Sequence, residues 1–186
     1  MANILGLIVA RNANAGYDVK NEGSKGDLVF YGSEEMHYCI QKNLEAIGVG
    51  RRNLRKIRTD DSYRIDFDKL RNQVERDQEA GLKPVCVVGC AGSTNTGSID
   101  NLEMLREICT EYSMWFHVDA AFGAWAAITP NYKHLVRGME SADSLAVDLH
   151  KWMYMPYGIG LLLVRDSEAH YRSFSEQADY ITHERS

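Results

Sequence analysis

The hydrophobic and polar residues of the chain fall into two alternating patterns. Short apolar runs bounded by glycine, asparagine or aspartate are typical of buried strands, whereas apolar residues that recur every three or four positions are typical of helices that bury one face. The predicted strands are residues 27–33, 53–60, 83–93, 114–121, 143–148 and 158–165. The predicted helices are a buried segment around residues 4–9 and the stretches 33–50, 66–81 and 100–113.

Local signals at the ends support these helices. Ser33 stands at the N-cap position expected for the helix over 33–50, and two glutamates follow it in the first turn. Asp100 stands at the start of the helix over 100–113. The stretch 12–26 is rich in glycine and asparagine, so it is predicted to be a loop.

Strands and helices alternate along most of the chain, which is the order of an α/β fold with a mostly parallel sheet and helices on both faces. No helix is predicted between the last two strands, 143–148 and 158–165, so one of them is expected to run antiparallel. Ligands of open α/β sheets bind beyond the carboxyl ends of the strands. Three predicted strand ends carry unusual residues, at 92–94, 119–121 and 150–151, and parallel neighbours would bring them into one crevice.

The bulk composition is that of one ordinary globular domain, with 186 residues of which 45% are hydrophobic and 25% charged. The formal net charge of −5, without a basic run, gives no sign of a nucleic-acid surface. No apolar run reaches the roughly 18 residues of a membrane helix, and the apolar start lacks the positive residues of a signal peptide. The four cysteines match neither a disulfide framework nor a zinc site, so we expect reduced thiols, no metal and a cytoplasmic location.

A lysine stands at one of the predicted strand ends, within the segment ADSLAVDLHKWMYMPYG over 142–158. Most lysines are solvated surface charges, but Lys151 follows a buried strand and lies between His150 and Trp152. A lysine amine that is desolvated or held near other cations is neutral more often, and it can then form a Schiff base with an aldehyde.

Asp119 ends another predicted strand, after four apolar or aromatic positions and before small apolar residues. It is either a helix cap or loop acid, or a carboxylate with a cationic partner, because a buried carboxylate is costly without one. A lysine that forms a Schiff base, together with an aspartate that faces a pyridinium nitrogen, is the pair that pyridoxal phosphate requires. His37, near the start of a predicted helix, is either an ordinary half-buried histidine or a residue that stacks on such a ring, opposite the small Ala121.

These segments resemble those of a known family. HVDAAFGAWAA over 117–127 and ADSLAVDLHKWMYMPYG over 142–158 are similar to the group II pyridoxal-phosphate-dependent amino-acid decarboxylases, which include the aromatic-L-amino-acid, histidine and glutamate decarboxylases. The resemblance extends to the apolar start, to 33–50 and to GCAGSTNTGSIDNL over 89–102. It implies the large cofactor domain of the type I aminotransferase fold.

The resemblance also implies a role for each candidate residue in a pyridoxal phosphate site. Lys151 would carry the Schiff base, and Asp119 would pair with the pyridinium nitrogen. Ala121 and His37 would pack on the two faces of the ring. Thr94 would contact the cofactor or its surroundings.

Two further catalytic roles follow from the same resemblance. His150 is expected near the phosphate and the substrate carboxylate. Tyr180, about thirty residues after the lysine, is implied to deliver a proton to the α-carbon after carbon dioxide leaves. Tyr171 is a competing candidate for this role, and either tyrosine alone also fits an ordinary surface position.

The resemblance covers only part of the family's length. The family's phosphate-binding loop, its N-terminal dimerisation segment and its C-terminal small domain have no counterpart in residues 1–186. We therefore expect the chain to be one partial cofactor domain, an incomplete α/β unit whose full-length form is a homodimer.

The function expected from the resemblance is decarboxylation of an L-amino acid to an amine and carbon dioxide. Trp152, Tyr154, Tyr157 and Phe122 favour an aromatic substrate, although they fit a core or a dimer interface equally well. Two alternatives stay open at this point. The chain could be a catalytically silent unit that acts in binding or assembly, or it could support an aldehyde synthase on the same scaffold.

Overall fold

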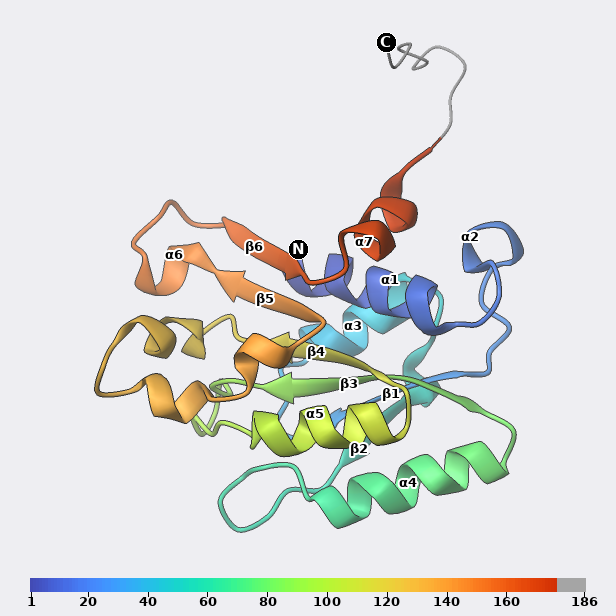
Figure 1. The fold of residues 1–186 in the computed structure, drawn as a ribbon, viewed down its shortest axis with the longest axis horizontal. Coiled ribbons are helices and arrows are strands. Elements are labelled where there is room, and N and C mark those ends of the chain that lie inside the picture. The colour runs from blue at the N-terminus through green and yellow to red at the C-terminus, as the bar shows by residue number, and fades with distance from the viewer. Residues whose placement is uncertain (177–186) are drawn as a thin grey trace.

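The computed structural model describes residues 1–176 and shows a six-stranded sheet with the strand order β2-β1-β3-β4-β5-β6 (Figure 1). The strands are β1 (Leu28–Ser33), β2 (Leu54–Ile57), β3 (Lys83–Cys90), β4 (Trp115–Asp119), β5 (Ser144–Asp148) and β6 (Gly160–Val164). Neighbours from β2 to β5 pair in parallel, and β6 pairs antiparallel with β5. The prediction of a mostly parallel sheet with one antiparallel member is therefore confirmed.

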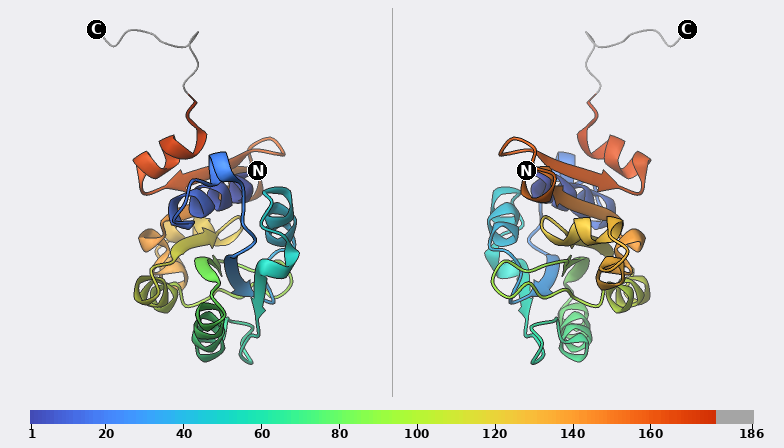
Figure 2. Two further views of the ribbon diagram at one scale, coloured as in Figure 1. Left: turned by 90° about the vertical axis from the view of Figure 1, so that its right-hand side faces the viewer. Right: turned by 90° about the vertical axis from the view of Figure 1, so that its left-hand side faces the viewer.

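Helices cover both faces of this sheet, as the sequence predicts. They are α1 (Ala2–Asn14), α2 (Val19–Glu22), α3 (Cys39–Ala46), α4 (Phe67–Glu79), α5 (Leu102–Glu111), α6 (Leu149–Trp152) and α7 (Ser167–Phe174). Short 3₁₀ helices lie at Arg51–Asn53, Gly123–Ile128, Lys133–Val136 and Met139–Ser141. Helices α1, α3 and α7 pack on one face, and α4 and α5 pack on the other (Figures 1 and 2).

Alternating side chains along the strands supply both helix layers with apolar contacts. In β1, Leu28 and Phe30 belong to the core that includes α1 and α3, whereas Val29 and Tyr31 belong to the core that includes α4 and α5. All four side chains are fully buried. A strand that is covered on both faces reads as a continuous apolar run, which is why the sequence marks it clearly.

The start of α3 differs from the prediction. Ser33 is the last residue of β1 rather than a helix N-cap, and the helix begins only at Cys39. The backbone of Ser33 is held in the parallel ladder opposite Ile57, and the next amide, of Glu34, donates to the Ile57 carbonyl. Because strand pairing extends this far, His37 lies in the turn before the helix and not in its first turns.

Three helices lie where the sequence predicts none, and two of them, α2 and α6, have only four residues. The third is α7, which starts where the Asp166 side chain accepts from two backbone amides. The Asp18 side chain accepts hydrogen bonds from two backbone amides and starts α2 inside the predicted loop. Helix α6 is a single turn between β5 and β6, and it carries Lys151. Four-residue helices leave almost no periodic signal in a sequence, which explains why both were missed.

Asp100 has a structural role that the sequence does not reveal. It does not cap α5, because the side chain of Asn101 does so by accepting from the Met104 amide. The Asp100 carboxyl group is buried and accepts hydrogen bonds from the Ile65 and Cys90 amides, both at 2.8 Å. It thereby ties the loop before α4 to the end of β3, where the candidate site begins.

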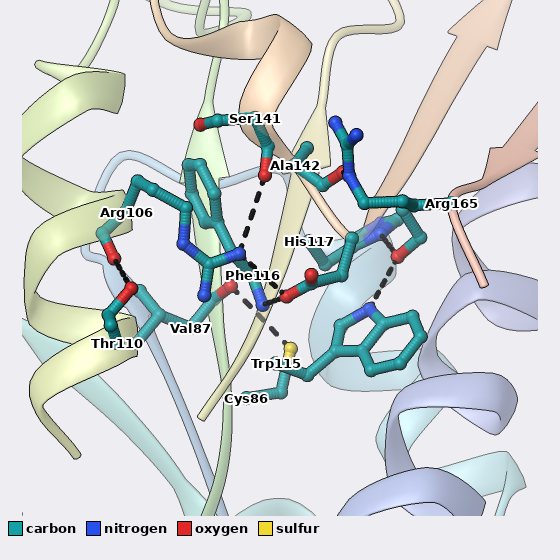
Figure 3. Close-up of polar contacts among 12 residues, drawn as sticks. Cys86, Val87, Arg106, Thr110, Trp115, Phe116, His117, Ser141, Ala142 and Arg165 are labelled. Carbon is teal, nitrogen blue, oxygen red and sulfur yellow. Dashed lines mark hydrogen bonds and ion pairs between the residues drawn. The ribbon is translucent and has the colours of Figure 1, made fainter. Parts of the chain in front are cut away.

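A second polar contact fixes α5 against the sheet. The Arg106 guanidinium donates to the Asp143 carboxylate at 3.0 Å and to the Ser141 carbonyl at 3.3 Å, and it lies beside the Phe116 ring (Figure 3). The same Asp143 oxygen accepts from the Phe116 amide at 2.7 Å. This carboxylate therefore links α5, β4 and the start of β5.

The pH dependence of stability provides a test of the Asp100 contact. Burial raises the pKa of the Asp100 carboxyl group to about 6, against the lowering effect of the two amide hydrogen bonds. Between the ordinary pKa of an aspartate and this raised value, the folded state keeps a proton that the unfolded state releases. The stabilisation from protonated Asp100 is therefore fully present below about pH 4 and is lost as the pH rises through 6. We expect Asp100→Asn to lose less of its free energy of unfolding than the wild type between pH 4 and 7.

The measurement is urea unfolding of both proteins across this pH range. Between pH 4 and 7 the wild type should lose more of its free energy of unfolding than Asp100→Asn does, by on the order of 1–3 kcal/mol, since one pKa unit corresponds to about 1.4 kcal/mol. Parallel pH profiles for the two proteins would show that Asp100 does not titrate in this range.

Candidate functional site

A cavity of about 560 Å³ lies beyond the carboxyl ends of the central parallel strands. This volume is in the range of roughly 300–1,000 Å³ that small-molecule sites occupy. Its lining includes residues from all three predicted strand ends: Gly92, Ser93 and Thr94 after β3, Asp119 and Ala121 at β4, and Lys151 after β5. Because β3, β4 and β5 are parallel neighbours, the fold brings together residues that are far apart in the sequence.

Lys151 reaches the cavity from the one-turn helix α6. Its Nζ lies 3.0 Å from an oxygen of Asp148, the last residue of β5. The two side chains are 38% and 25% exposed, so the ion pair is partly solvated and contributes little to stability. The contact orients the amine at the cavity edge without enclosing it.

Asp119 is the buried acid of the cavity. Burial raises the pKa of its carboxyl group, while the Ala121 amide, the Asn3 side chain and the charges of His37 and Lys151 oppose that shift. The Ala121 amide donates to it at 3.2 Å. Among residues 1–176, the ion pairs at the cavity reach Asp148 and not Asp119. This acid is therefore short of a cationic partner within the described part of the chain.

His37 and Ala121 both line the cavity, as the predicted ring-packing residues must. The Nδ1 atom of His37 accepts a hydrogen bond from the Cys39 amide at 3.3 Å, which helps to hold the ring in the turn before α3. Ala121 follows the buried end of β4 and leaves the space above it free of a large side chain. The structure thus brings both residues to the same site as Asp119 and Lys151.

Thr94 lines the cavity from the loop after β3. Three hydroxyl groups close by brace this loop, because Ser93, Thr96 and Ser98 lie within hydrogen-bond distance of one another, at 2.5, 3.0 and 3.1 Å. This triangle of hydroxyl groups is not among the residues predicted for the site. The cluster of small hydroxyl residues around Gly92 and Gly97 is the signal that could have identified it.

His150 is placed differently from the cavity residues. Its Nδ1 lies 3.0 Å from the Ile159 carbonyl oxygen, its ring packs near Tyr157, and it is not part of the cavity lining. Tyr171 is an exposed residue of α7. Tyr180 lies outside the described residues. The catalytic roles of these three residues stay predictions.

Two loops approach each other closely at the cavity edge. The Gly123 amide donates to the Ala91 carbonyl at 2.9 Å, and a Cβ on Gly123 would lie only 2.4 Å from that oxygen. The loop after β4, which carries Ala121, can therefore reach the end of β3 only because residue 123 has no side chain.

Comparison with known proteins identifies the family. The model of the pyridoxal-dependent decarboxylase conserved domain matches residues 1–186. The chain belongs to the pyridoxal-dependent decarboxylase family. It is 34% identical to an aromatic-L-amino-acid decarboxylase of Bacillus atrophaeus, over 97% of the chain and 36% of that protein. It is 33% identical to an aspartate 1-decarboxylase of Aliivibrio fischeri, over 97% of the chain and 35% of that protein.

Solved structures agree with this membership of the decarboxylase family. The crystal structure of mouse CSAD matches with a TM-score of 0.91 and 30% identity, over 95% of the chain and 37% of that protein. The structure of Catharanthus roseus tryptophan decarboxylase in complex with L-tryptophan matches with a TM-score of 0.84 and 31% identity, over 96% of the chain and 38% of that protein. The predicted family and fold class are therefore confirmed.

The decarboxylase-family chain spans about a third of the length of these relatives. The cofactor of the family, pyridoxal phosphate, and its enzyme class, the carboxy-lyases, are those predicted from the sequence. In the described part of the chain, no helix is both long and apolar enough to cross a bilayer.

The close approach at Gly123 yields a prediction about the cavity edge. We expect Gly123→Ala to lower the free energy of unfolding by about 1–3 kcal/mol, because the new Cβ forces the Ala91 carbonyl and the loop after β4 apart. Gly160→Ala is the matched control, since a Cβ there meets nothing closer than 3.6 Å. Urea unfolding measures both, and equal stability of the two variants would contradict the close approach.

Proposed function

We propose that this chain binds pyridoxal phosphate in its cavity and decarboxylates an L-amino acid to the amine and carbon dioxide. The observation that carries the proposal is the presence of Lys151 and Asp119 in one cavity of suitable volume. Family membership supports the reaction class, because the relatives named above are decarboxylases.

The residues of the cavity fit this cofactor chemically. An aromatic aldehyde with a ring nitrogen needs an amine at one end and an acid at the other. Lys151 supplies an amine that is partly exposed and can be reached from the cavity. Asp119 supplies a buried carboxyl group whose pKa is raised by burial, and a protonated ring nitrogen would stabilise its ionised form.

Bound pyridoxal phosphate supplies the electron sink for breaking the bond between the α-carbon and the carboxylate. The chain's own residues hold it for this purpose. Lys151 would form the covalent link, Asp119 would keep a proton on the ring nitrogen, and His37 and Ala121 would confine the ring between them.

Proton delivery to the α-carbon needs a separate donor. We propose Tyr180 as the donor, with His150 as the alternative, on the basis of the resemblance. A group of this kind must come within hydrogen-bond reach of the substrate. His150 would need to turn away from the Ile159 carbonyl to do so.

The substrate class that we propose is an aromatic L-amino acid. Phe122 lines the cavity, and its ring packs edge-on against Trp152 at 5.3 Å between centroids. Two aromatic rings therefore lie near Lys151, because Phe122 lines the same cavity and Trp152 is the next residue of α6. The relatives include decarboxylases named for tyrosine, aspartate and histidine, so the side chain of the substrate must be tested directly.

An aldehyde synthase is the second candidate, because the chain is also 34% identical to a phenylacetaldehyde synthase of a Rosa hybrid cultivar. We favour decarboxylation because His37 is present at the cavity and Tyr180 is present in the sequence. The silent alternative, in which the chain acts only in binding or assembly, predicts that no cofactor is retained.

The full-length protein is proposed to be a cytoplasmic homodimer. Tyr154 and Tyr157 are 91% and 94% exposed in the loop after α6, next to the exposed Trp152. Aromatic side chains of this kind are enriched in the buried centres of protein interfaces. Sedimentation of the full-length protein measures this assembly directly.

Covalent capture of the cofactor is the central test of the proposal. We expect full-length protein mixed with pyridoxal phosphate to turn yellow, and borohydride to fix the cofactor on Lys151, as located by peptide mass mapping. Lys151→Arg keeps the positive charge beside Asp148 but forms no such link, so its absorbance and mass should not change. Lys69→Arg is the control, because Lys69 in α4 also pairs with an aspartate, the N-cap residue Asp66, but does not line the cavity. This variant should capture the cofactor as the wild type does. Cofactor that washes off the wild type would favour the silent alternative.

Product analysis separates the remaining reactions. We expect the full-length protein to release equal amounts of amine and carbon dioxide from one or more aromatic L-amino acids in a panel. Aldehyde with hydrogen peroxide and ammonia in place of the amine would identify an aldehyde synthase. Turnover restricted to acidic amino acids would overturn the proposed substrate class.

A further inference from the structure

Three buried polar side chains behind the cavity wall, together with the half-buried Asn3 that lines the cavity, form a continuous chain that the proposed reaction does not use. The Trp115 indole nitrogen donates to the Ser144 hydroxyl at 2.8 Å. That hydroxyl lies 2.7 Å from Nδ1 of His117, and Nε2 of the same ring lies 2.9 Å from Oδ1 of Asn3. Asn3 and Asp119 both line the cavity, and the Asn3 side chain lowers the pKa of the Asp119 carboxyl group. The Asn3 amide nitrogen also lies 3.8 Å from Cys39 Sγ. We refer to Trp115, Ser144, His117 and Asn3 as the relay.

The relay is assembled by the same elements that build the cavity. Trp115 and His117 are alternate residues of β4, so their side chains point to the same side of the strand, away from Phe116 and Arg106 (Figure 3). Ser144 is the register partner of His117 on β5. Asn3 comes from α1, which approaches the ring closely because Gly6, one turn later, has no side chain: a Cβ there would lie 2.7 Å from the His117 ring.

Only one direction of hydrogen bonding satisfies every group in the relay. The indole of Trp115 can only donate, and an ionised Asp119 can only accept. The Ser144 hydroxyl therefore donates its hydrogen bond to Nδ1 of His117, and the Nε2–H of the ring donates to Oδ1 of Asn3. The NH₂ group of Asn3 then has two hydrogens, one toward Cys39 Sγ and one that can point toward Asp119. The reverse arrangement would turn Oδ1 toward the carboxylate.

The ring at the centre of the relay is neutral, as this assignment requires. His117 is fully buried, and burial lowers its pKa to about 4. At neutral pH it therefore has one N–H donor and one acceptor nitrogen, and it can connect a donor on one side to an acceptor on the other. A charged ring would donate from both nitrogens, so Nδ1 could no longer accept the hydrogen bond from Ser144.

We propose that Asn3 is a positioning residue for Asp119, and that the buried relay fixes which way the amide of Asn3 points. The inference rests on the proposed function, in which Asp119 faces the cofactor ring nitrogen. Its consequence is that the carboxylate meets the cofactor already oriented and hydrogen-bonded from behind, so little reorganisation is needed when the ring binds.

Measurements on the cofactor-free protein test the relay directly. Nitrogen NMR of labelled histidine should show His117 as the neutral Nε2–H tautomer in the wild type, and this preference should be lost in Ser144→Ala. Carbon NMR of the Asp119 carboxyl group should show titration at higher pH in Asn3→Leu than in the wild type. A wild-type Nδ1–H tautomer, or unchanged titration in Asn3→Leu, would overturn the relay.

Asn14→Leu is the matched control, because it is the same substitution in the same helix. The Asn14 amide ties α1 to the carbonyls of Val85 and Ser113, at 3.2 and 3.1 Å, and does not contact the relay. It reproduces the loss of a helix-to-sheet contact without altering Asp119. Asp119 should therefore titrate in Asn14→Leu as it does in the wild type.

Cofactor affinity tests the functional half of the inference. We expect Asn3→Leu and Ser144→Ala to bind pyridoxal phosphate about tenfold or more weakly than Asn14→Leu in the full-length protein, since hydrogen bonds to charged groups are the stronger ones. Equal affinity of all three variants would show that the relay does not act on the cofactor. Wild-type protein that binds no cofactor, while the NMR results hold, would refute the proposed function and leave the relay standing.

Discussion

The structure of the site depends on one constraint, which is the burial of a carboxyl group at the end of strand β4. Asp119 is only 9% exposed, between parallel neighbours on both sides. A carboxylate in such a place needs donors and a cation, since water cannot solvate it. The Ala121 amide donates to it, the Asn3 side chain lowers its pKa, and His37 and Lys151 line the same cavity. In the function that we propose, a ring with a protonated nitrogen would supply the missing cation.

The parts of the fold that the sequence predicts well are those where one local signal dominates. Strand β1 reads as a strand because helices bury both of its faces, and α4 reads as a helix because Asp66 caps it and its apolar residues share one face. The start of α3 was mispredicted for the opposite reason. Ser33 is a good N-cap by its chemistry, but its backbone is engaged in the parallel ladder, and a sequence does not show where strand pairing stops.

The candidate site follows the same division. Lys151, Asp119 and Thr94 could be predicted because each follows an apolar strand, and parallel strands bring such positions together. Asn3 and Asp100 could not, because their partners are distant in the sequence and no local pattern links them: Asn3 contacts a ring at position 117, and Asp100 binds the amide of residue 65. Side chains that act on backbone amides or through other side chains leave no spacing rule to detect.

Three aspartates near the cavity show how surroundings divide roles between identical groups. Asp148 is partly exposed and pairs with the partly exposed amine of Lys151. Asp100 is buried and accepts from two backbone amides, which fixes loops but leaves its carboxyl group with a pKa of about 6. Asp119 lies between these cases, because it is buried like Asp100 but opens onto the cavity. An acid that must meet a ring cation needs this combination, since full exposure would weaken the interaction and full enclosure would leave no room for the ring.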